Sequence, residues 1–174
     1  MKSEKIKIGI LGGSFDPAHK GHLAISKKAR KRFDLKKIIW AITKKNPFKK
    51  ESDTSVSNRI KKCKKVIGEN LFIKVKFYEN IIKSNKTIDL ITYLKKNKNN
   101  KVYFLMGADN LINFHKWHKS KLISQKCNIL VFDRHGFKKN SLKSKTFKKL
   151  DKSILKFIEF KKVNISSSQL RKIW

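Results

Sequence analysis

The feature that most constrains the fold is a regular alternation between short apolar runs and longer charged stretches. Most of the apolar runs are rich in β-branched residues, which is typical of buried strands. The stretches between them carry apolar residues at helical spacing on a lysine-rich background. We expect strands at 6–11, 37–43, 72–78, 102–107, 128–133 and 157–163, and helices at 22–34, 55–67, 87–94 and around 111–114. Strands that alternate with helices form βαβ units, so the pattern predicts an α/β fold with a Rossmann-like open, mostly parallel sheet and helices on both faces.

Length and cysteine usage narrow the class of protein further. The 174 residues are predicted to form a single domain, 1–174. Cys63 and Cys127 make neither a disulfide framework nor a zinc pattern, as expected of reduced thiols in a cytoplasmic protein. No apolar run is long enough for a signal peptide or a membrane span, so we expect no membrane partner. Residues 137–152 are a charge run, predicted to be a loop, a mobile flap or a marginal helix.

The charge of the chain is extreme, with 45 Lys and Arg against 12 Asp and Glu and a formal net charge of +33. A nucleic-acid-binding surface needs such a surplus, and positive charge can also steer small anionic substrates. Only five of the 45 cations are arginine, the residue that binds phosphate bidentately. Abundant Lys, Asn and Ile indicate an AT-rich coding sequence. We therefore attribute the charge mainly to compositional bias and expect no specific nucleic-acid partner.

The stretch GGSFDPAHKGH, residues 12–22, follows the first predicted strand and is nearly free of lysine. Gly12 and Gly13 allow a sharp turn and a close approach of a ligand phosphate to the backbone. The end of the stretch opens a helix, whose free N–H groups and positive dipole end attract anions. His19 lies three residues before His22, so both imidazoles can point to one side and stabilise charge that develops on a reacting phosphorus.

The position of this loop fits a nucleotide site. Open parallel sheets bind ligands at the carboxyl ends of their strands, near the point where the strand order reverses. The first strand ends at GGSFDPAHKGH and the fourth at GADN, residues 107–110, so both polar segments are expected at the same edge.

Other interpretations of the loop fit less well. The chain has no GK[ST] segment, so the loop is not a Walker loop, and Gly9, Gly12 and Gly13 do not fit GxGxxG. A zinc pair at His19 and His22 lacks a convincing third ligand. A plain glycine turn with two surface histidines explains only part of the stretch.

The loop resembles the (S/T)FDPxHxGH signature of the nucleotidylyltransferase superfamily, the HxGH-type adenylyl- and cytidylyltransferases. The superfamily has a second signature, ISS(S/T)xxR, which is matched by ISSSQLR at residues 165–171. Ser166 and Gln169 fit a capping box, which gathers serine hydroxyls and N–H groups at another helix N-terminus, with Arg171 following. Taken alone, so short a segment is better explained as a plain helix cap with a solvated arginine. The two segments together predict one pocket around a triphosphate.

The middle of the chain is similar to the nicotinate-nucleotide adenylyltransferase family. YFLMGADNLINFHKWHKS (103–120) resembles the family's G-(A/S)-D-x-x-x-x-(F/L)-x-x-W pattern, NPFKK (46–50) its NP(L/F)K loop and VFDRHG (131–136) its V-x-R-x-G segment. The resemblance implies adenylyl transfer from ATP to nicotinate mononucleotide, giving nicotinate adenine dinucleotide and pyrophosphate in bacterial NAD synthesis.

The resemblance also implies a role for each matching residue. It assigns catalysis to His19, His22, Lys49 and Arg171, nucleotide binding to Gly12, Gly13, Ser14, Phe15, Arg134, Ser167 and Ser168, and substrate binding to Thr87, Asp109 and Trp117. Asp109 would face a ribose, and Trp117 would stack on the nicotinate ring. Thr87 would hold the nicotinate carboxylate through its backbone N–H at a helix start. Mg²⁺ is implied as an ion carried by ATP, and no metal ligands are expected in the chain, which shows no paired acids.

Two of these assignments have a structural alternative. Trp117 could be a core residue or a wedge between helices, and Asp109 could cap the helix that follows it. Phe114 is expected to pack, and His115 and His118 are expected on the surface.

Other functions also remain open. Another adenylyltransferase of the superfamily, acting on phosphopantetheine or nicotinamide mononucleotide, would share both end signatures, although the phosphopantetheine enzymes lack the GADNxxxxFHxW stretch. A basic nucleic-acid-binding protein on this fold would have no need of His19, His22 and Arg171. The sequence is compatible with a homo-oligomer and does not fix the oligomeric state.

Overall fold

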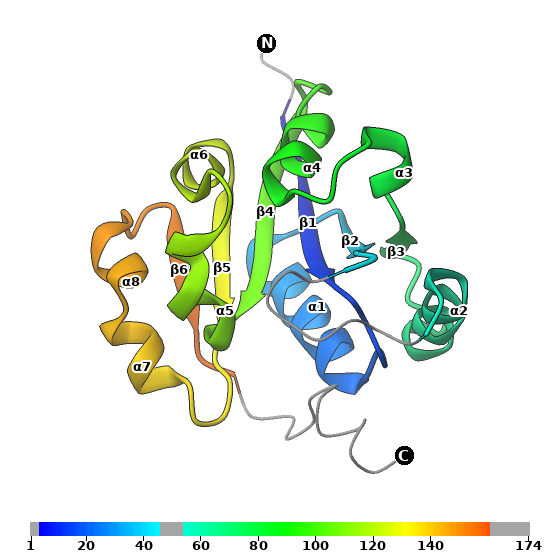
Figure 1. Ribbon diagram of the computed structural model, residues 1–174, viewed down its shortest axis with the longest axis horizontal. Coiled ribbons are helices and arrows are strands. Elements are labelled where there is room, and N and C mark those ends of the chain that lie inside the picture. Colours follow the sequence, from blue (N-terminus) through cyan, green and yellow to red (C-terminus); the bar gives the residue numbers. More distant parts are fainter. Residues whose placement is uncertain (1–3, 46–53, 161–174) are drawn as a thin grey trace.

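The computed structural model describes residues 4–45 and 54–160, which form a six-stranded, wholly parallel sheet flanked by helices (Figure 1). The strands are β1 (Ile6–Gly13), β2 (Lys37–Ile42), β3 (Ile73–Lys76), β4 (Asn100–Gly107), β5 (Asn128–Phe132) and β6 (Leu155–Ile158). Their order across the sheet is β3-β2-β1-β4-β5-β6. The first three strands extend the sheet to one side of β1. β4 then pairs with the other edge of β1, and β5 and β6 extend the sheet in that direction. The predicted Rossmann-like α/β fold is thereby confirmed.

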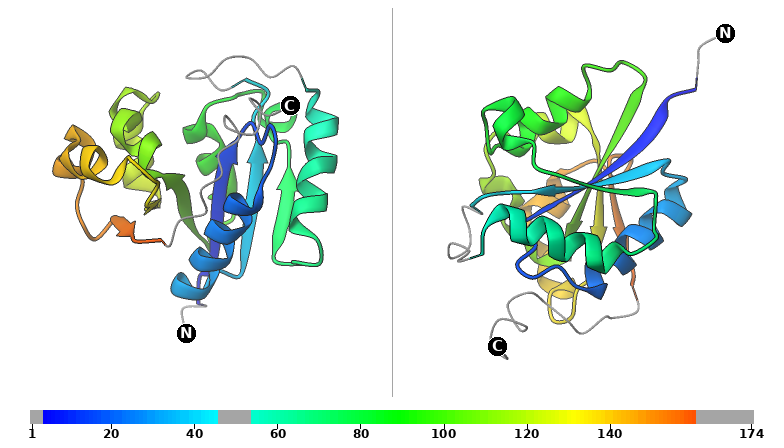
Figure 2. Two further views of the ribbon diagram at one scale, coloured as in Figure 1. Left: turned by 90° about the horizontal axis from the view of Figure 1, so that it is seen from below. Right: turned by 90° about the vertical axis from the view of Figure 1, so that its right-hand side faces the viewer.

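Helices cover both faces of the sheet (Figure 2). They are α1 (Lys20–Phe33), α2 (Val56–Ile67), α3 (Glu79–Ile82), α4 (Thr87–Leu94), α5 (Ala108–Asn113), a 3₁₀ turn η1 (Phe114–Lys116), α6 (Ser120–Lys126), α7 (Lys138–Lys143) and α8 (Lys145–Lys149). α1 and α2 pack on one face, and α4, α5, α6 and α8 pack on the other.

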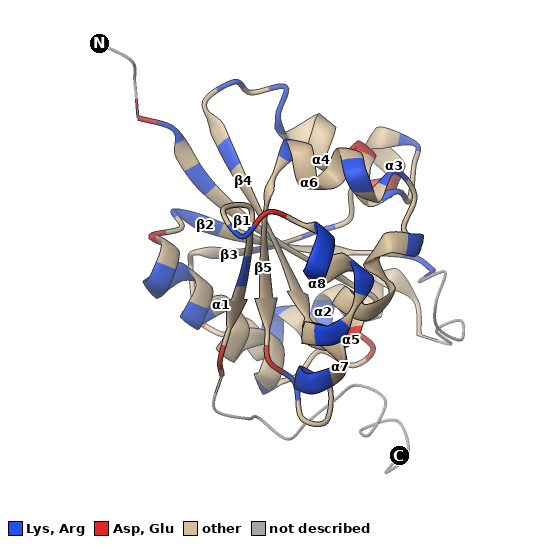
Figure 3. Cartoon of the chain, turned by 90° about the vertical axis from the view of Figure 1, so that its left-hand side faces the viewer, with Lys and Arg blue, Asp and Glu red and all other residues tan. Residues whose placement is uncertain are grey.

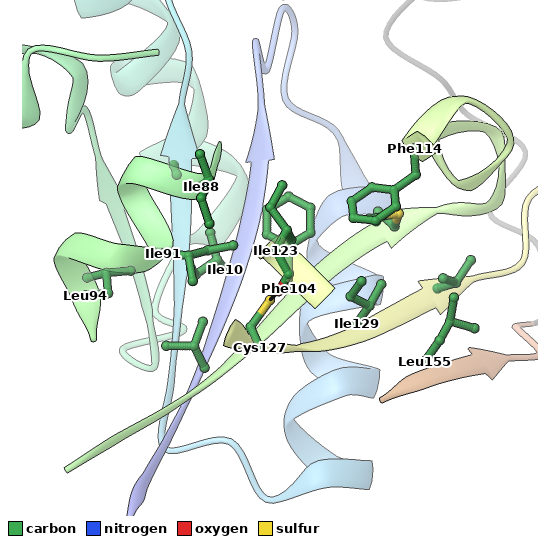
Figure 4. Packing of buried hydrophobic residues seen from close by; sticks show 14 of the residues in the cluster. Ile10, Ile88, Ile91, Leu94, Phe104, Phe114, Ile123, Cys127, Ile129 and Leu155 are labelled. Atoms are coloured by element: carbon green, nitrogen blue, oxygen red, sulfur yellow. Dashed lines mark hydrogen bonds between the residues drawn. The ribbon is translucent and has the colours of Figure 1, made fainter. Parts of the chain in front are cut away.

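The four central strands, β1, β2, β4 and β5, are buried on both faces, and their alternate residues therefore join different cores. In β4, Phe104 and Met106 face the α4–α6 side, whereas Tyr103 and Leu105 face α1 and α2. Figure 4 shows the α4–α6 side, where Phe114 is buried as the sequence predicted. A strand with two buried faces is a continuous apolar run, which explains why the strands gave the clearest sequence signal.

The last strand begins two residues earlier than expected. β6 pairs with β5 from Leu155 to Ile158, and these two end residues are the ones that the sheet buries. The predicted strand at 157–163 overlaps β6 at two residues, and residues 161–163 lie outside the described part of the chain. The alternation of apolar and charged residues therefore predicted that a strand lies here, but not which of its residues pair with β5.

The charge run at 137–152 contains two short helices, α7 and α8, so the helical alternative was the right one for most of it. The Ser144 hydroxyl accepts the N–H of Phe147 at 3.1 Å and thereby caps α8. Ser141 and Thr146 are buried beneath the lysines. The most buried residues of this segment are small and polar, and Phe147 and Leu150, which pack against the core, are only partly buried, so the segment shows no continuous apolar stripe at helical spacing. The helices α3 and α6 were not expected either.

Both cysteines are free and buried. Burial raises the pKa of the Cys63 thiol to about 12 against the opposing effect of Arg59, and it raises that of Cys127 to about 12 against Lys95. Both are therefore neutral thiols near pH 7. In the two described ranges, no helix has the length and apolar character needed to cross a membrane. The cytoplasmic location and the single-domain boundaries stay predictions.

Cations are spread over the molecule. Figure 3 shows Lys and Arg on α1 and also on α7 and α8, which lie on the other side of the sheet. A nucleic-acid interface collects cations on one face or along one helix, whereas a compositional bias distributes them. The observed spread supports the second explanation of the net charge.

Candidate active site

The polar segments selected from the sequence follow β1 and β4, which are neighbours in the sheet. β1 ends at Gly13 and β4 at Gly107, and the strand order reverses between these two strands. Ligands of open parallel sheets bind in the crevice at such a point. Lys49, Ser167, Ser168 and Arg171 lie outside the described residues, so their positions, and the meeting of the two signature segments, stay predictions.

The loop after β1 turns later than the sequence analysis expected. Gly12 and Gly13 are not turn residues but the last two residues of β1, paired with Ala41 and Ile42 of β2. The turn falls at Phe15, whose φ is 51°. Left-handed backbone is rare for a bulky residue, and packing holds it here, because Phe15 is only 2% exposed and stacks on Trp40 with ring centroids 5.0 Å apart.

His19 and His22 lie side by side at the start of α1, with ring centroids 3.8 Å apart. His19 is the N-cap residue, and its Nδ1 accepts the N–H of Gly21 at 3.1 Å. The Nδ1 of His22 accepts the N–H of His19 at 3.2 Å. Because both Nδ1 atoms are acceptors, each neutral ring carries its proton on Nε2. The capping arrangement thus fixes two imidazoles as Nε2–H donors at a helix N-terminus.

A buried network holds His22 from behind. The Trp40 indole donates its Nε1–H to Ser26 Oγ at 2.9 Å, and Ser26 Oγ donates to the backbone carbonyl of His22 at 2.9 Å. Phe15 lies between the two rings, 4.8 Å from the His22 centroid and 5.0 Å from that of Trp40. No local pattern around Trp40 or Ser26 indicates that these residues support the histidine.

Asp109 and Arg134 form an ion pair at the ends of β4 and β5. Arg134 Nη1 donates to Asp109 Oδ2 at 2.5 Å, and both side chains are partly buried. Among the described residues, the buried Oδ1 of Asp109 has no hydrogen-bond partner. Gly107, not Asp109, occupies the N-cap position of α5, which has no side-chain cap. The capping alternative is therefore wrong.

A cavity of about 400 Å³ opens at the same edge, between the ends of β1, β2 and β4 and the start of α4. Gly12 and Gly13 form part of its wall, so these glycines allow close approach rather than a turn. Two predicted substrate-binding residues, Thr87 and Trp117, also line it. The structure therefore brings these two residues to the strand end from which the histidine loop departs.

Trp117 and Thr87 occupy different positions in this wall. Trp117 is half-buried and packs edge-on against Phe104, with ring centroids 5.9 Å apart. Trp117 therefore packs on the core and also faces the cavity, so a packing role and a substrate-binding role do not exclude each other. Thr87 is the first residue of α4, whose N-cap Lys86 has extended backbone.

The sequence analysis missed several wall residues. They are Thr43, Tyr78, Glu79, Asn85, Lys86, Asn110 and Lys116, and His118 also lines the cavity although it is exposed, as predicted. Burial raises the pKa of Tyr78, and Tyr93 beside it raises that pKa further, so the phenol stays neutral. Glu79 could have been suspected, because it is one of only twelve acids and follows a predicted strand.

The fold and the loop after β1 place the chain among the Rossmann-like α/β proteins that bind nucleotides at this edge of the sheet. The family model described as "Cytidylyltransferase-like" matches residues 10–173. The chain belongs to this cytidylyltransferase-like family, and its curated relatives place it among the nicotinate-nucleotide adenylyltransferases.

Two of these relatives carry the name "Probable nicotinate-nucleotide adenylyltransferase". The protein of Pelagibacter ubique (strain HTCC1062) is 67% identical over 173 residues, which cover 99% of this chain and 96% of the relative. That of a Nitratiruptor species is 38% identical over 136 residues, covering 76% of each chain. In fold, the chain is similar to the Plasmodium falciparum nicotinic acid mononucleotide adenylyltransferase complexed with NaAD, with a TM-score of 0.75, 24% identity, and coverage of 95% of this chain and 82% of that one.

Proposed function

We propose that this chain transfers the adenylyl group of ATP to nicotinate mononucleotide, giving nicotinate adenine dinucleotide and pyrophosphate in NAD synthesis. The single observation that carries the proposal is the pair of Nε2–H donors that the backbone fixes at the start of α1. The near full-length likeness to a probable enzyme of this activity supports it.

The chemistry needs no covalent intermediate on the enzyme, because the phosphate of nicotinate mononucleotide is itself a nucleophile. One of its oxygens attacks the α-phosphorus of ATP, and the bond from that phosphorus to the bridging oxygen breaks as pyrophosphate leaves with the electron pair. The protein must hold two polyanions in line and offset their repulsion. His19 and His22 would donate to the phosphoryl oxygens as their charge grows, and the positive dipole end of α1 would favour the same charge.

The cavity is suited to the nicotinate half of the substrate. Trp117 would offer a flat aromatic face to the electron-poor pyridine ring. A carboxylate at the start of the eight-residue helix α4, beside Thr87, would be stabilised by the helix N–H groups and dipole. Lys86 and Lys116 add positive charge to the wall. A neutral amide would gain less from these groups, so we propose a preference for the acid over nicotinamide mononucleotide.

The remaining assignments complete the proposal. Asp109, held by Arg134 through one carboxylate oxygen, would face a ribose, with the adenine near Arg134. Gly12, Gly13, Ser14 and Phe15 form the backbone that meets the phosphates. The roles of Lys49, Ser167, Ser168 and Arg171, around the triphosphate, rest on the family resemblance alone.

Mg²⁺ belongs to the proposal as part of the ATP substrate. Within the ranges that the structure describes, no three or more His, Cys, Asp or Glu side chains are grouped so that they could hold a metal ion. The ion would offset charge on the leaving pyrophosphate, and the protein residues would bind and orient the ATP that carries the ion.

The proposal is tested by pyrophosphate release from purified protein with Mg-ATP and either nicotinate or nicotinamide mononucleotide. We expect turnover with both and a higher kcat/KM for the acid. Absence of turnover with both nucleotides would contradict the proposed function. A clear preference for the amide would instead identify nicotinamide mononucleotide as the substrate.

A further inference from the structure

Arg59 is a buried cation that the proposed mechanism does not use. It lies on α2, is only 2% exposed and occupies a position on the inward stripe that otherwise carries Cys63 and Ile67. A buried charge is costly unless it is paired or fully hydrogen-bonded. No carboxylate in the described residues pairs with Arg59, and the nearby Cys63 thiol, with its pKa raised to about 12, stays neutral.

The partners of Arg59 are four backbone carbonyl oxygens from three separate segments. Its Nη1 donates to Ser14 and to Thr43 at 2.8 Å each, its Nε to Thr54 at 3.0 Å, and its Nη2 approaches Lys44 at 3.4 Å. These segments are the loop after β1, the stretch after β2 and the residue before the cap of α2. One guanidinium therefore joins three connections around the candidate site.

The Thr43–Lys44 peptide is also held from its other side. Glu79, in the cavity wall, accepts the Thr43 hydroxyl at 2.5 Å and the Lys44 N–H at 3.2 Å through the same carboxylate oxygen. Arg59 binds the carbonyl of this peptide and Glu79 its N–H. The Thr43 N–H, in the preceding peptide, donates to Gly13 O at 3.0 Å and ties this segment to the end of β1.

The Ser14–Phe15 peptide is oriented by the same guanidinium. Because C=O and N–H point in opposite directions in a trans peptide, binding of the Ser14 carbonyl turns the Phe15 N–H away from Arg59. Phe15 is the residue with left-handed backbone on which the ring of His22 rests. The orientation of this one peptide therefore affects both a backbone donor and a catalytic imidazole.

We propose that Arg59 is a positioning residue for adenylyl transfer, which sets the Ser14–Phe15 and Thr43–Lys44 peptides from behind the site. Among the described residues that line the cavity Arg59 does not appear, so it acts through these backbone groups and not on the substrate. The inference rests on the proposed function. It explains why a charge replaces an apolar residue on a buried helical stripe, where a hydrophobic side chain would cost less.

The decisive variant is Arg59→Lys, because lysine keeps the charge and the reach but cannot bridge carbonyls with a planar fork. Lys62→Arg on the exposed side of α2 is the matched control. Both are assayed for kcat, for KM of each substrate and for melting temperature, at a temperature where both are folded. We expect Arg59→Lys to lose about thirtyfold in kcat with KM changed by less than about threefold, since misplacement of reacting groups mainly slows the chemical step. A lower melting temperature with kcat preserved within about twofold would show a merely structural role and overturn the proposal.

A second measurement does not depend on turnover. Amide hydrogen exchange of Thr43 and Lys44 is compared between Arg59→Lys and wild type, with the Leu105 amide in the sheet as the internal reference. We expect about tenfold faster exchange of the two loop amides and no change at Leu105. Without the guanidinium, the Thr43–Lys44 segment opens locally more often, while global unfolding is unaffected. Unchanged protection of both amides would overturn the role. If the wild-type enzyme shows no turnover, the proposed function has failed, and the exchange result alone decides whether Arg59 positions these peptides.

Discussion

The two sides of the candidate site are built in different ways. On the phosphate side, Phe15 and Trp40 are buried and the histidine rings are fixed by backbone hydrogen bonds. On the cavity side, Lys86 and His118 are exposed. Donors aimed at developing charge work best when they need no reorganisation, whereas exposed, long side chains lose rotamer freedom when they bind. In the proposed mechanism, the groups that act on the phosphates are therefore in place before substrate binds, whereas recognition of the pyridine is more adaptable.

The largest expected effect tests the phosphate side. His22→Ala removes an Nε2–H donor and the acceptor for the His19 N–H. We expect kcat to fall about 10²- to 10³-fold while KM for both substrates stays within a few fold, because the lost bond strengthens only in the transition state. Steady-state kinetics of this variant, with the exposed His115→Ala as control, measure the effect. An unchanged kcat in His22→Ala would remove the histidine from the mechanism.

A smaller effect is expected on the cavity side, at Trp117. Trp117→Ala should raise KM for nicotinate mononucleotide about tenfold, since stacking of a base on an aromatic ring contributes roughly 1–3 kcal/mol. KM for ATP should stay nearly constant. Trp117→Phe is the matched variant and should recover most of the affinity. If both variants instead lower the melting temperature and leave KM unchanged, Trp117 is a packing residue.

The smallest effect sharpens the difference between acid and amide. Lys86→Ala should lower the ratio of kcat/KM for nicotinate over nicotinamide mononucleotide about two- to fivefold, because an exposed charge contributes roughly 0.2–1 kcal/mol. Raising the salt concentration should shrink the difference. Lys98→Ala, exposed and outside the cavity wall, serves as control. An unaltered ratio would indicate that the N–H groups and dipole at the start of α4, and not Lys86, discriminate between the acid and the amide.

The sheet could be predicted because its central strands are buried on both faces, as the run from Val102 to Met106 illustrates. The histidine loop could be located because it follows such a run. The turn at Phe15 could not be predicted, because left-handed backbone at an aromatic residue is stabilised here by contacts with Trp40 and His22. Trp40 is distant in sequence, and the contact with His22 forms only once the turn has formed.

Long-range pairs account for the rest of what the sequence concealed. Asp109 and Arg134 were assigned separately, to a ribose and to the adenine side, and only the sheet shows that they share a hydrogen bond. Arg59 resembles any solvated cation in a lysine-rich helix, and its burial depends on carbonyls up to 45 residues away. Such contacts have no local pattern, because they follow from the order of the strands.

The histidine at the start of α1 has a consequence for how this chain can evolve. The His19 ring caps the helix through its Nδ1, and in the proposed mechanism its Nε2–H donates to the phosphates. Under that mechanism a replacement at position 19 lowers both stability and turnover, so selection acts on the two properties together.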